Sequence, residues 1–119
     1  MSHYFGNIRA KSVGNRNFKE TVHIGQKIEL SVMSLEPDEE TGEEIRADHD
    51  RYIRVEEGQA KLILDGSVLD LVADEAVVVP AGSRHEIVNA SSEVPLKLSV
   101  VSAPPEHRVG AVYPRKRDA

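Results

Sequence analysis

The chain contains no cysteine among its 119 residues. Disulfide bridges and zinc sites with thiolate ligands are therefore excluded. It also lacks an apolar run resembling a signal peptide or a membrane span, which predicts a cytoplasmic protein with no membrane partner. No segment keeps a helical hydrophobic period over three turns, so we expect low helix content.

An excess of basic residues is also missing. The sequence has 15 Lys and Arg residues against 20 Asp and Glu residues, a formal net charge of -5 at pH 7. A general nucleic-acid binder would need clustered positive charge, so we expect no nucleic-acid partner. The sequence also has no P-loop, no dinucleotide-binding glycine motif, no zinc-ribbon spacing and no Ser-His-Asp order in a convincing context. The acidic stretch at 36–44 and the basic residues near both ends predict solvated faces or a charge match between subunits.

Short stretches of alternating apolar and polar residues, separated by turn signals, fill most of the chain. In one of them, Ile28, Leu30 and Val32 share a face, and Pro104 and Pro105 must end the last long strand. The spacing predicts one all-β domain, a sandwich or barrel. Strands are expected at 18–23, 27–32, 51–57, 59–64, 67–72, 75–79, 84–89 and 94–102, with an edge strand or arm at 108–113. The predicted organisation is an irregular arm at 1–17, a barrel at 18–113 and a basic tail at 114–119.

A tight turn followed by a histidine is the clearest motif. Residues 76–79 form a short, mostly β-branched run that predicts a buried strand, and Pro80 and Gly82 then supply the turn. His85 opens the next strand, and Asn89 lies four residues later on the same face. The turn therefore aims the histidine in a fixed direction.

This pattern resembles the second motif of the cupin superfamily, G(x)5PxG(x)2H(x)3N, whose histidine binds a metal ion inside a small jelly-roll barrel. The leading glycine of that motif is replaced by Asp74. The first cupin motif, roughly G(x)5HxH(x)3-4E(x)6G, would end at Gly58. In that register Glu44 and Arg46 stand at the two histidine positions, and Arg51 stands where the family has glutamate or glutamine. Three of the four expected ligand types are therefore missing.

The resemblance covers roughly residues 27–113 and is closest to small single-domain bacterial cupins, many of which are described as sugar-isomerase-like. It implies an all-β cupin double-stranded β-helix, or jelly-roll barrel, with a binding site for a small polar molecule, anionic or sugar-like, at the barrel mouth. It also implies a homodimer in which the arm of one subunit adds to the sheet of the other. Whether such a protein is an enzyme stays open, because the superfamily hosts many chemistries.

Two functional interpretations of the barrel mouth follow. In the first, His85, His49 and the carboxylate of Glu44 hold one divalent metal ion, namely iron, zinc, manganese or nickel, for an isomerase-like or oxygenase reaction. In the second, Arg46 and Arg51 bind a small anion without metal, and His85 transfers a proton or donates a hydrogen bond.

A third interpretation assigns no ligand to the barrel mouth. Arg51 would pair with Glu44, His85 would be hydrogen-bonded to a neighbour, and the family's metal site would have become a satisfied polar plug. The protein would then be a structural or partner-binding dimer. The sequence alone does not decide among the three.

Overall fold

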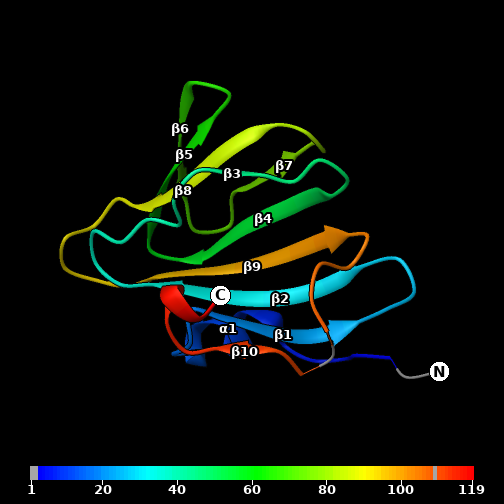
Figure 1. Cartoon of the computed structure of the whole chain (residues 1–119). Coiled ribbons are helices and arrows are strands. Elements are labelled where there is room, and N and C mark those ends of the chain that lie inside the picture. Colours follow the sequence, from blue (N-terminus) through cyan, green and yellow to red (C-terminus); the bar gives the residue numbers. More distant parts are fainter. Residues whose placement is uncertain (1–2, 109) are drawn as a thin grey trace.

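The computed structural model describes residues 3–108 and 110–119, and in them ten strands form two antiparallel sheets. The order of the six-stranded sheet is β10 (Val112–Tyr113), β1 (Lys19–Ile24), β2 (Glu29–Leu35), β9 (Leu96–Ala103), β4 (Asp50–Glu57) and β7 (Ala76–Val79). The order of the four-stranded sheet is β3 (Glu44–Ile45), β8 (Arg84–Asn89), β5 (Gln59–Leu64) and β6 (Ser67–Val72). Figure 1 shows most strands of the larger sheet running side by side. The predicted all-β fold is confirmed.

Alternation along the strands builds the interior. In β4, for example, Arg51, Ile53 and Val55 point inward and are buried, whereas Tyr52 between them is exposed. The apolar core joins both sheets. Its buried members are Phe18, Met33, Leu35, Ile53, Val55, Ala60, Leu62, Leu71, Val79, Ile87, Leu96, Leu98 and Val100. One end of the barrel interior is thus apolar, and the inward-pointing polar residues lie at the other end.

Two tight turns depend on residues with positive φ. Gly58, between β4 and β5, has φ 97°, and a Cβ atom there would lie 2.9 Å from the carbonyl oxygen of Pro95, so only glycine fits. Asp65 and Gly66 have φ values of 47° and 87° and join β5 to β6 as a two-residue hairpin loop, as the type I′ turn requires. Both turns fall in the gaps between the strands expected at 51–57, 59–64 and 67–72.

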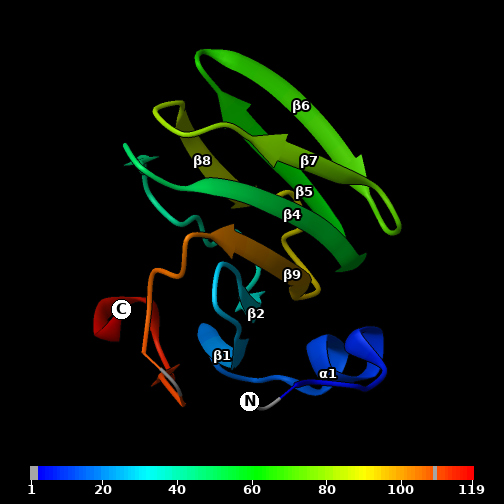
Figure 2. The same cartoon turned by 90° about the vertical axis from the view of Figure 1, so that its right-hand side faces the viewer.

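The prediction of an irregular arm at 1–17 was wrong for part of that segment. A helix, α1 (Ile8–Gly14), begins after Asn7, whose side chain accepts a hydrogen bond from the Ala10 backbone N–H at 3.0 Å. It packs on the outer face of the larger sheet, where Ser12 donates to the Leu98 carbonyl oxygen at 2.9 Å. Figure 2 shows α1 on the side away from β5 and β6. A helix of seven residues is too short to be recognised from its hydrophobic periodicity. A helix this short is stabilised by tertiary contacts.

The basic tail at 114–119 also contains local structure, a 3-10 helix named η1 (Lys116–Asp118). Next to it in the chain, the expected edge strand is present as β10, which pairs with β1. No helix in the described ranges is long and apolar enough to cross a membrane.

Candidate functional site

The strand register brings polar side chains to one end of the barrel interior. Glu29 of β2 is paired with Ser102 of β9, and Ser102 is paired with Arg51 of β4, so all three point to the same side. On the smaller sheet Glu44 of β3 is paired with His85 of β8. Residue Glu106, just after β9, completes the group. The mouth cluster, as we call it, consists of Glu44, Arg46, Arg51, His85 and Glu106.

Arg51 lies at the centre of the mouth cluster, and its side chain is only 3% exposed. Its Nη1 donates to Glu44 Oε2 at 2.7 Å and to His85 Nε2 at 3.1 Å, and its Nε donates to Glu106 Oε2 at 3.1 Å. One guanidinium therefore bridges a histidine and two carboxylates that come from three different segments of the chain. The fork geometry of the group makes this possible.

These contacts fix the protonation of His85. A guanidinium has only donors, so the Nε2 atom of His85 must accept and carries no proton. Nδ1 then holds the proton and faces the Ser83 carbonyl oxygen at 3.3 Å. Burial lowers the pKa of His85, and the charge of Arg51 lowers it further. His85 is thus a neutral imidazole.

Arg46 forms the outer part of the cluster, with its side chain 37% exposed. Its Nε donates to Glu106 Oε1 at 2.6 Å, and its Nη2 lies 3.8 Å from Glu44 Oε2. Burial favours a raised pKa for Glu106, but the charge of Arg51 and the hydrogen bond from Ser102 outweigh it and lower the pKa to about 2. The two arginines and two carboxylates compensate one another's charge.

Glu29 fastens the segment that carries Glu106. Its Oε1 accepts the backbone N–H groups of Glu106 and His107, each at 2.8 Å. Its Oε2 accepts from the Thr21 hydroxyl at 3.0 Å and lies 2.9 Å from His107 Nδ1. Burial would raise the pKa of Glu29, yet these N–H donors keep it below its usual range. Glu29 therefore positions Glu106 against the two arginines.

The structure brings together four of the five residues that the sequence singled out, namely Glu44, Arg46, Arg51 and His85. The fifth, His49, lies elsewhere: its Nδ1 is 2.7 Å from the Pro104 carbonyl oxygen. The proposed metal set of His85, His49 and Glu44 is therefore not assembled. Within 3–108 and 110–119, no three His, Asp or Glu side chains form a group that could hold a metal ion.

The donor chemistry of the mouth does not fit the metal that the cupin resemblance implies. His85 Nε2 and Glu44 Oε2 are 3.7 Å apart, a spacing that could suit a shared cation, but Arg51 Nη1 contacts both of them. A divalent ion at that position would be repelled by the guanidinium at close range. Arg51 thus fills the place of the cation with its own charge.

Asn89, the last residue of the recognised motif, has a different task. Its Nδ2 donates to the carbonyl oxygens of Leu35, Glu36 and Val94 at 3.2, 3.1 and 2.9 Å. It ties the loops at the end of the barrel opposite the mouth cluster. The motif thus combines a structural asparagine with a histidine at the candidate site.

A hollow of about 530 Å³ lies on the outer face of the smaller sheet and is lined in part by Ile45, Ile63, Arg84 and Glu86, and it also reaches His85. Apart from His85, these side chains alternate with the inward ones, so strand β8 separates most of the hollow from Arg51. We therefore place the candidate site in the barrel interior rather than in this hollow.

Comparison with known proteins agrees with this fold. A family model described as "Cupin domain" matches residues 31–102. The chain belongs to the cupin family. Two relatives carry the names uncharacterized protein YrkC, of Bacillus subtilis, and uncharacterized protein L612, of Acanthamoeba polyphaga mimivirus. They are 33% and 32% identical over 95% of this cupin, which spans 63% and 72% of their respective lengths.

A solved structure, that of BH2720 from Bacillus halodurans, superimposes on this cupin with a TM-score of 0.93. The two are 30% identical, and the match covers 96% of this chain and 90% of the other. The overall fold of this chain is therefore shared with a solved structure.

Proposed function

We propose that this cupin binds a small polyhydroxylated, sugar-like molecule at the barrel mouth without a metal ion. The observation that carries the proposal is the triple contact of Arg51 with Glu44, His85 and Glu106. This triple contact leaves polar groups at the mouth, but the guanidinium of Arg51 occupies the position that a metal ion would need. A metal-dependent isomerase is therefore less well supported than a binding protein.

The rim of the site supports a neutral polar ligand. The side chains of Arg46 and Glu44 are 37% and 21% exposed, whereas those of Arg51 and Glu106 are 3% and 6% exposed. The rim thus offers a guanidinium donor next to a carboxylate acceptor. Each hydroxyl of a sugar can both donate and accept, so it can satisfy both groups. A simple anion at the rim would instead meet the carboxylates.

A thermal-shift screen with neutral sugars and sugar acids tests the proposal. A bound ligand should raise the melting temperature, since saturation at about 100 times Kd adds about 2.7 kcal/mol. The shift should survive a chelator and be lost in Arg46→Ala. Arg84→Ala is the matched control, because Arg84 lies on the outer face and pairs with Glu43. A protein that no compound stabilises, or a shift that the chelator abolishes, would contradict the proposal.

The homodimer implied by the family resemblance and the cytoplasmic location expected from the sequence stay predictions. Sedimentation analysis at several protein concentrations tests the first. We propose the dimer because the larger sheet exposes apolar side chains on its outer face, with Tyr52 at 39% and Val78 at 64% exposure on paired strands.

A further inference from the structure

Strand β6 forms an edge of the smaller sheet and carries few of the features that protect such edges. It pairs with β5 on one side, and in the described part of the chain no strand pairs with its other side. Edge strands are usually protected by lysine, proline or a bulge. The sequence of β6 is SVLDLV, its pairing with β5 shows no bulge, and its one charged residue is Asp70. The open side of β6 is therefore suited to pair with another strand.

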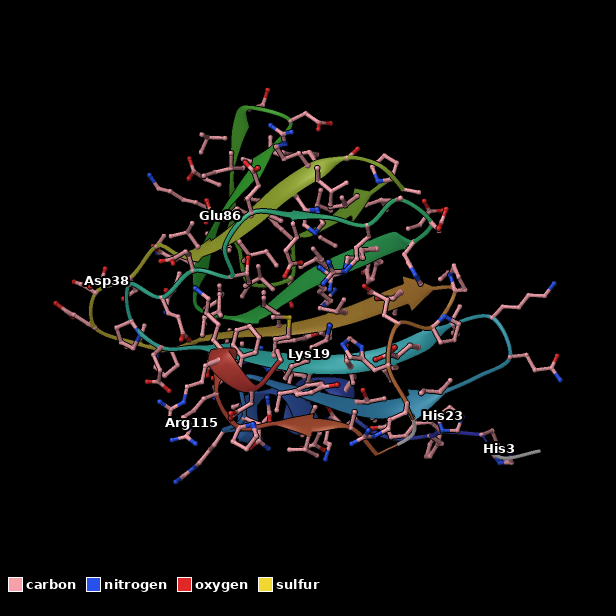
Figure 3. The ribbon with its side chains drawn as sticks, viewed as in Figure 1. His3, Lys19, His23, Asp38, Glu86 and Arg115 are labelled. Atoms are coloured by element: carbon pink, nitrogen blue, oxygen red, sulfur yellow. The ribbon has the colours of Figure 1, made fainter. Side chains whose placement is uncertain are left out.

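The hairpin of β5 and β6 lies at one end of the molecule. It is at the top of the view, and no other segment of the chain lies above it (Figure 1, Figure 3). Val68 is 58% exposed and Val72 is 50% exposed. Leu69 is paired with the buried Leu62, yet it is still 39% exposed. Exposed apolar side chains beside an unpaired edge favour contact with another protein.

Hydrogen bonds show which backbone groups of β6 face its open side. The Val72 N–H donates to Glu75 Oε1 at 2.9 Å, and the Val72 carbonyl oxygen accepts the Glu75 N–H at 3.0 Å, so both groups of Val72 point away from β5. This direction alternates along a strand, so the N–H and C=O groups of Val68 and Asp70 point to the same side. Within 3–108 and 110–119, these groups of Val68 and Asp70 have no hydrogen-bond partner.

We propose that two copies of this cupin associate by pairing their β6 strands antiparallel, so that the two smaller sheets become one continuous sheet. The inference specifies the contact in the homodimer proposed above, on which it rests, and it is independent of the ligand at the mouth. A two-fold axis places the same edge against itself. Val68 then lies opposite the partner's Asp70, and each such pair exchanges both of its N–H···O bonds.

The other registers are less favourable. With Asp70 opposite its own copy, two like charges would face each other directly, which destabilises a strand pair. In that register Val68 would also face Val72, whose backbone groups are already bonded. With Val68 opposite its own copy, Asp70 would face Gly66, which lies in the hairpin turn with φ 87° rather than in the strand. The remaining register places Leu69 opposite its copy, at a position without hydrogen bonds where side chains are closest.

Cysteine cross-linking tests the register, because the wild-type chain has no cysteine and any disulfide must join two copies. Leu69→Cys should form a disulfide-linked dimer under mild oxidation, since the paired Cα atoms would be about 4.5 Å apart and a disulfide spans roughly 4.4–6.8 Å. Val72→Cys is the matched control on the same strand. In this register Val72 lies about 20 Å from its copy, so Val72→Cys should cross-link at least about tenfold more slowly.

Sedimentation analysis of two further variants gives an independent readout. Val68→Pro removes an N–H group that points away from β5, a change that an edge strand tolerates, and it should convert the dimer to a monomer. Val78→Lys adds a charge to the other exposed apolar surface and should stay a dimer, because the strand pairing holds the two copies together. Circular dichroism checks that both variants are folded.

Two results would overturn the inference. The first is a Leu69→Cys variant that cross-links no faster than Val72→Cys. If the wild type still sediments as a dimer in that case, the homodimer stands and its contact lies elsewhere. The second is a wild type that is a monomer at every concentration, and then the homodimer and the strand pairing both fail. Neither result changes the binding at the mouth, which the thermal-shift screen measures separately.

Discussion

The guanidinium of Arg51 contacts three side chains of types that bind metals, Glu44, His85 and Glu106, which do not by themselves form a group that could hold a metal ion. Replacing it with a histidine removes the repelling charge and adds a fourth ligand. We therefore expect Arg51→His to bind about one zinc or nickel ion per chain, because three protein ligands of this kind are enough for an open zinc site. Elemental analysis after growth with added metals measures this.

The comparison needs three other proteins. Wild type and Arg84→His, which adds a histidine on the outer face, should carry only trace metal after the same treatment. Circular dichroism checks that Arg51→His is folded. Stoichiometric metal in the wild type that His85→Ala removes would contradict the assignment of Arg51 as the built-in cation.

Glu106 should make the free energy of unfolding decrease at acidic pH. Its pKa is about 2 in the folded protein against an ordinary 4.5, so its contribution is complete above pH 4.5 and is lost as the pH falls toward 2. At about 1.4 kcal/mol per pKa unit, the contribution is about 3 kcal/mol. Glu106→Gln should lower the free energy of unfolding near pH 7 by about this amount, since it leaves the buried Arg51 with one carboxylate fewer.

Urea unfolding at a series of pH values checks the expectation. The difference between wild type and Glu106→Gln should narrow below pH 4.5. Glu93→Gln, on an exposed loop, should match the wild type throughout. A Glu106→Gln difference that stays constant down to pH 2 would mean that Glu106 acts through packing rather than through its charge.

Between elements, Glu29 links strand β2 to the segment after β9. Its carboxylate accepts two backbone N–H groups there, those of Glu106 and His107. Glu29→Gln keeps one acceptor oxygen and loses the charge, which should speed hydrogen exchange at these two amides by about 10- to 100-fold, the equivalent of a hydrogen bond to a charged group. Exchange measured by NMR tests this. The Asn89 amide, bonded to the Glu39 carbonyl oxygen at the opposite end, should be unaffected.

The strands were predictable because alternation and turn residues agree along most of the chain. The predicted pairs of Arg51 with Glu44 and of His85 with a neighbour, one of the three interpretations of the mouth, are present. These contacts could be predicted from the spacing of the two motifs, because period-two alternation puts Arg51 and His85 on inward faces. His49 could not be placed, since it precedes β4 in a loop with no periodicity to orient it.

The polar lining contributed by β1 and β2 was not predictable. In β2 the apolar residues Leu30 and Val32 share a face, as expected, but that face points away from the barrel interior, and Val32 is buried on the outer side of the sheet that α1 covers. The residues that point inward are Glu29, Ser31 and Met33. Because a helix covers the outer face, an apolar stripe no longer identifies the inner one. Glu106 was missed for another reason, because it follows two prolines in a segment without a repeating pattern.

Across the whole molecule, the barrel interior contains as many positive as negative side chains around the mouth: Arg46, Arg51 and Lys19 against Glu44, Glu106 and Glu29. The surplus of negative charge, -5 in total, therefore lies on the surface. The balance depends on Lys19 staying protonated. Its lowered pKa means that the folded protein gives up this proton more readily than the unfolded chain does.

The stability of the molecule should therefore rise with pH in the alkaline range. Between pH 8 and 10.5 the unfolded chain binds more protons at Lys19 than the folded protein, so the free energy of unfolding increases through this window. Below it, the buried charge costs about 3 kcal/mol at about 1.4 kcal/mol per pKa unit. Lys19→Met should be more stable than wild type near pH 7 by up to about this amount, and the gain should vanish by pH 10.5. Urea unfolding across this range measures it, with the exposed Lys61→Met as the control. Parallel curves for wild type and Lys19→Met would show that Lys19 holds its proton as tightly in the barrel as in water.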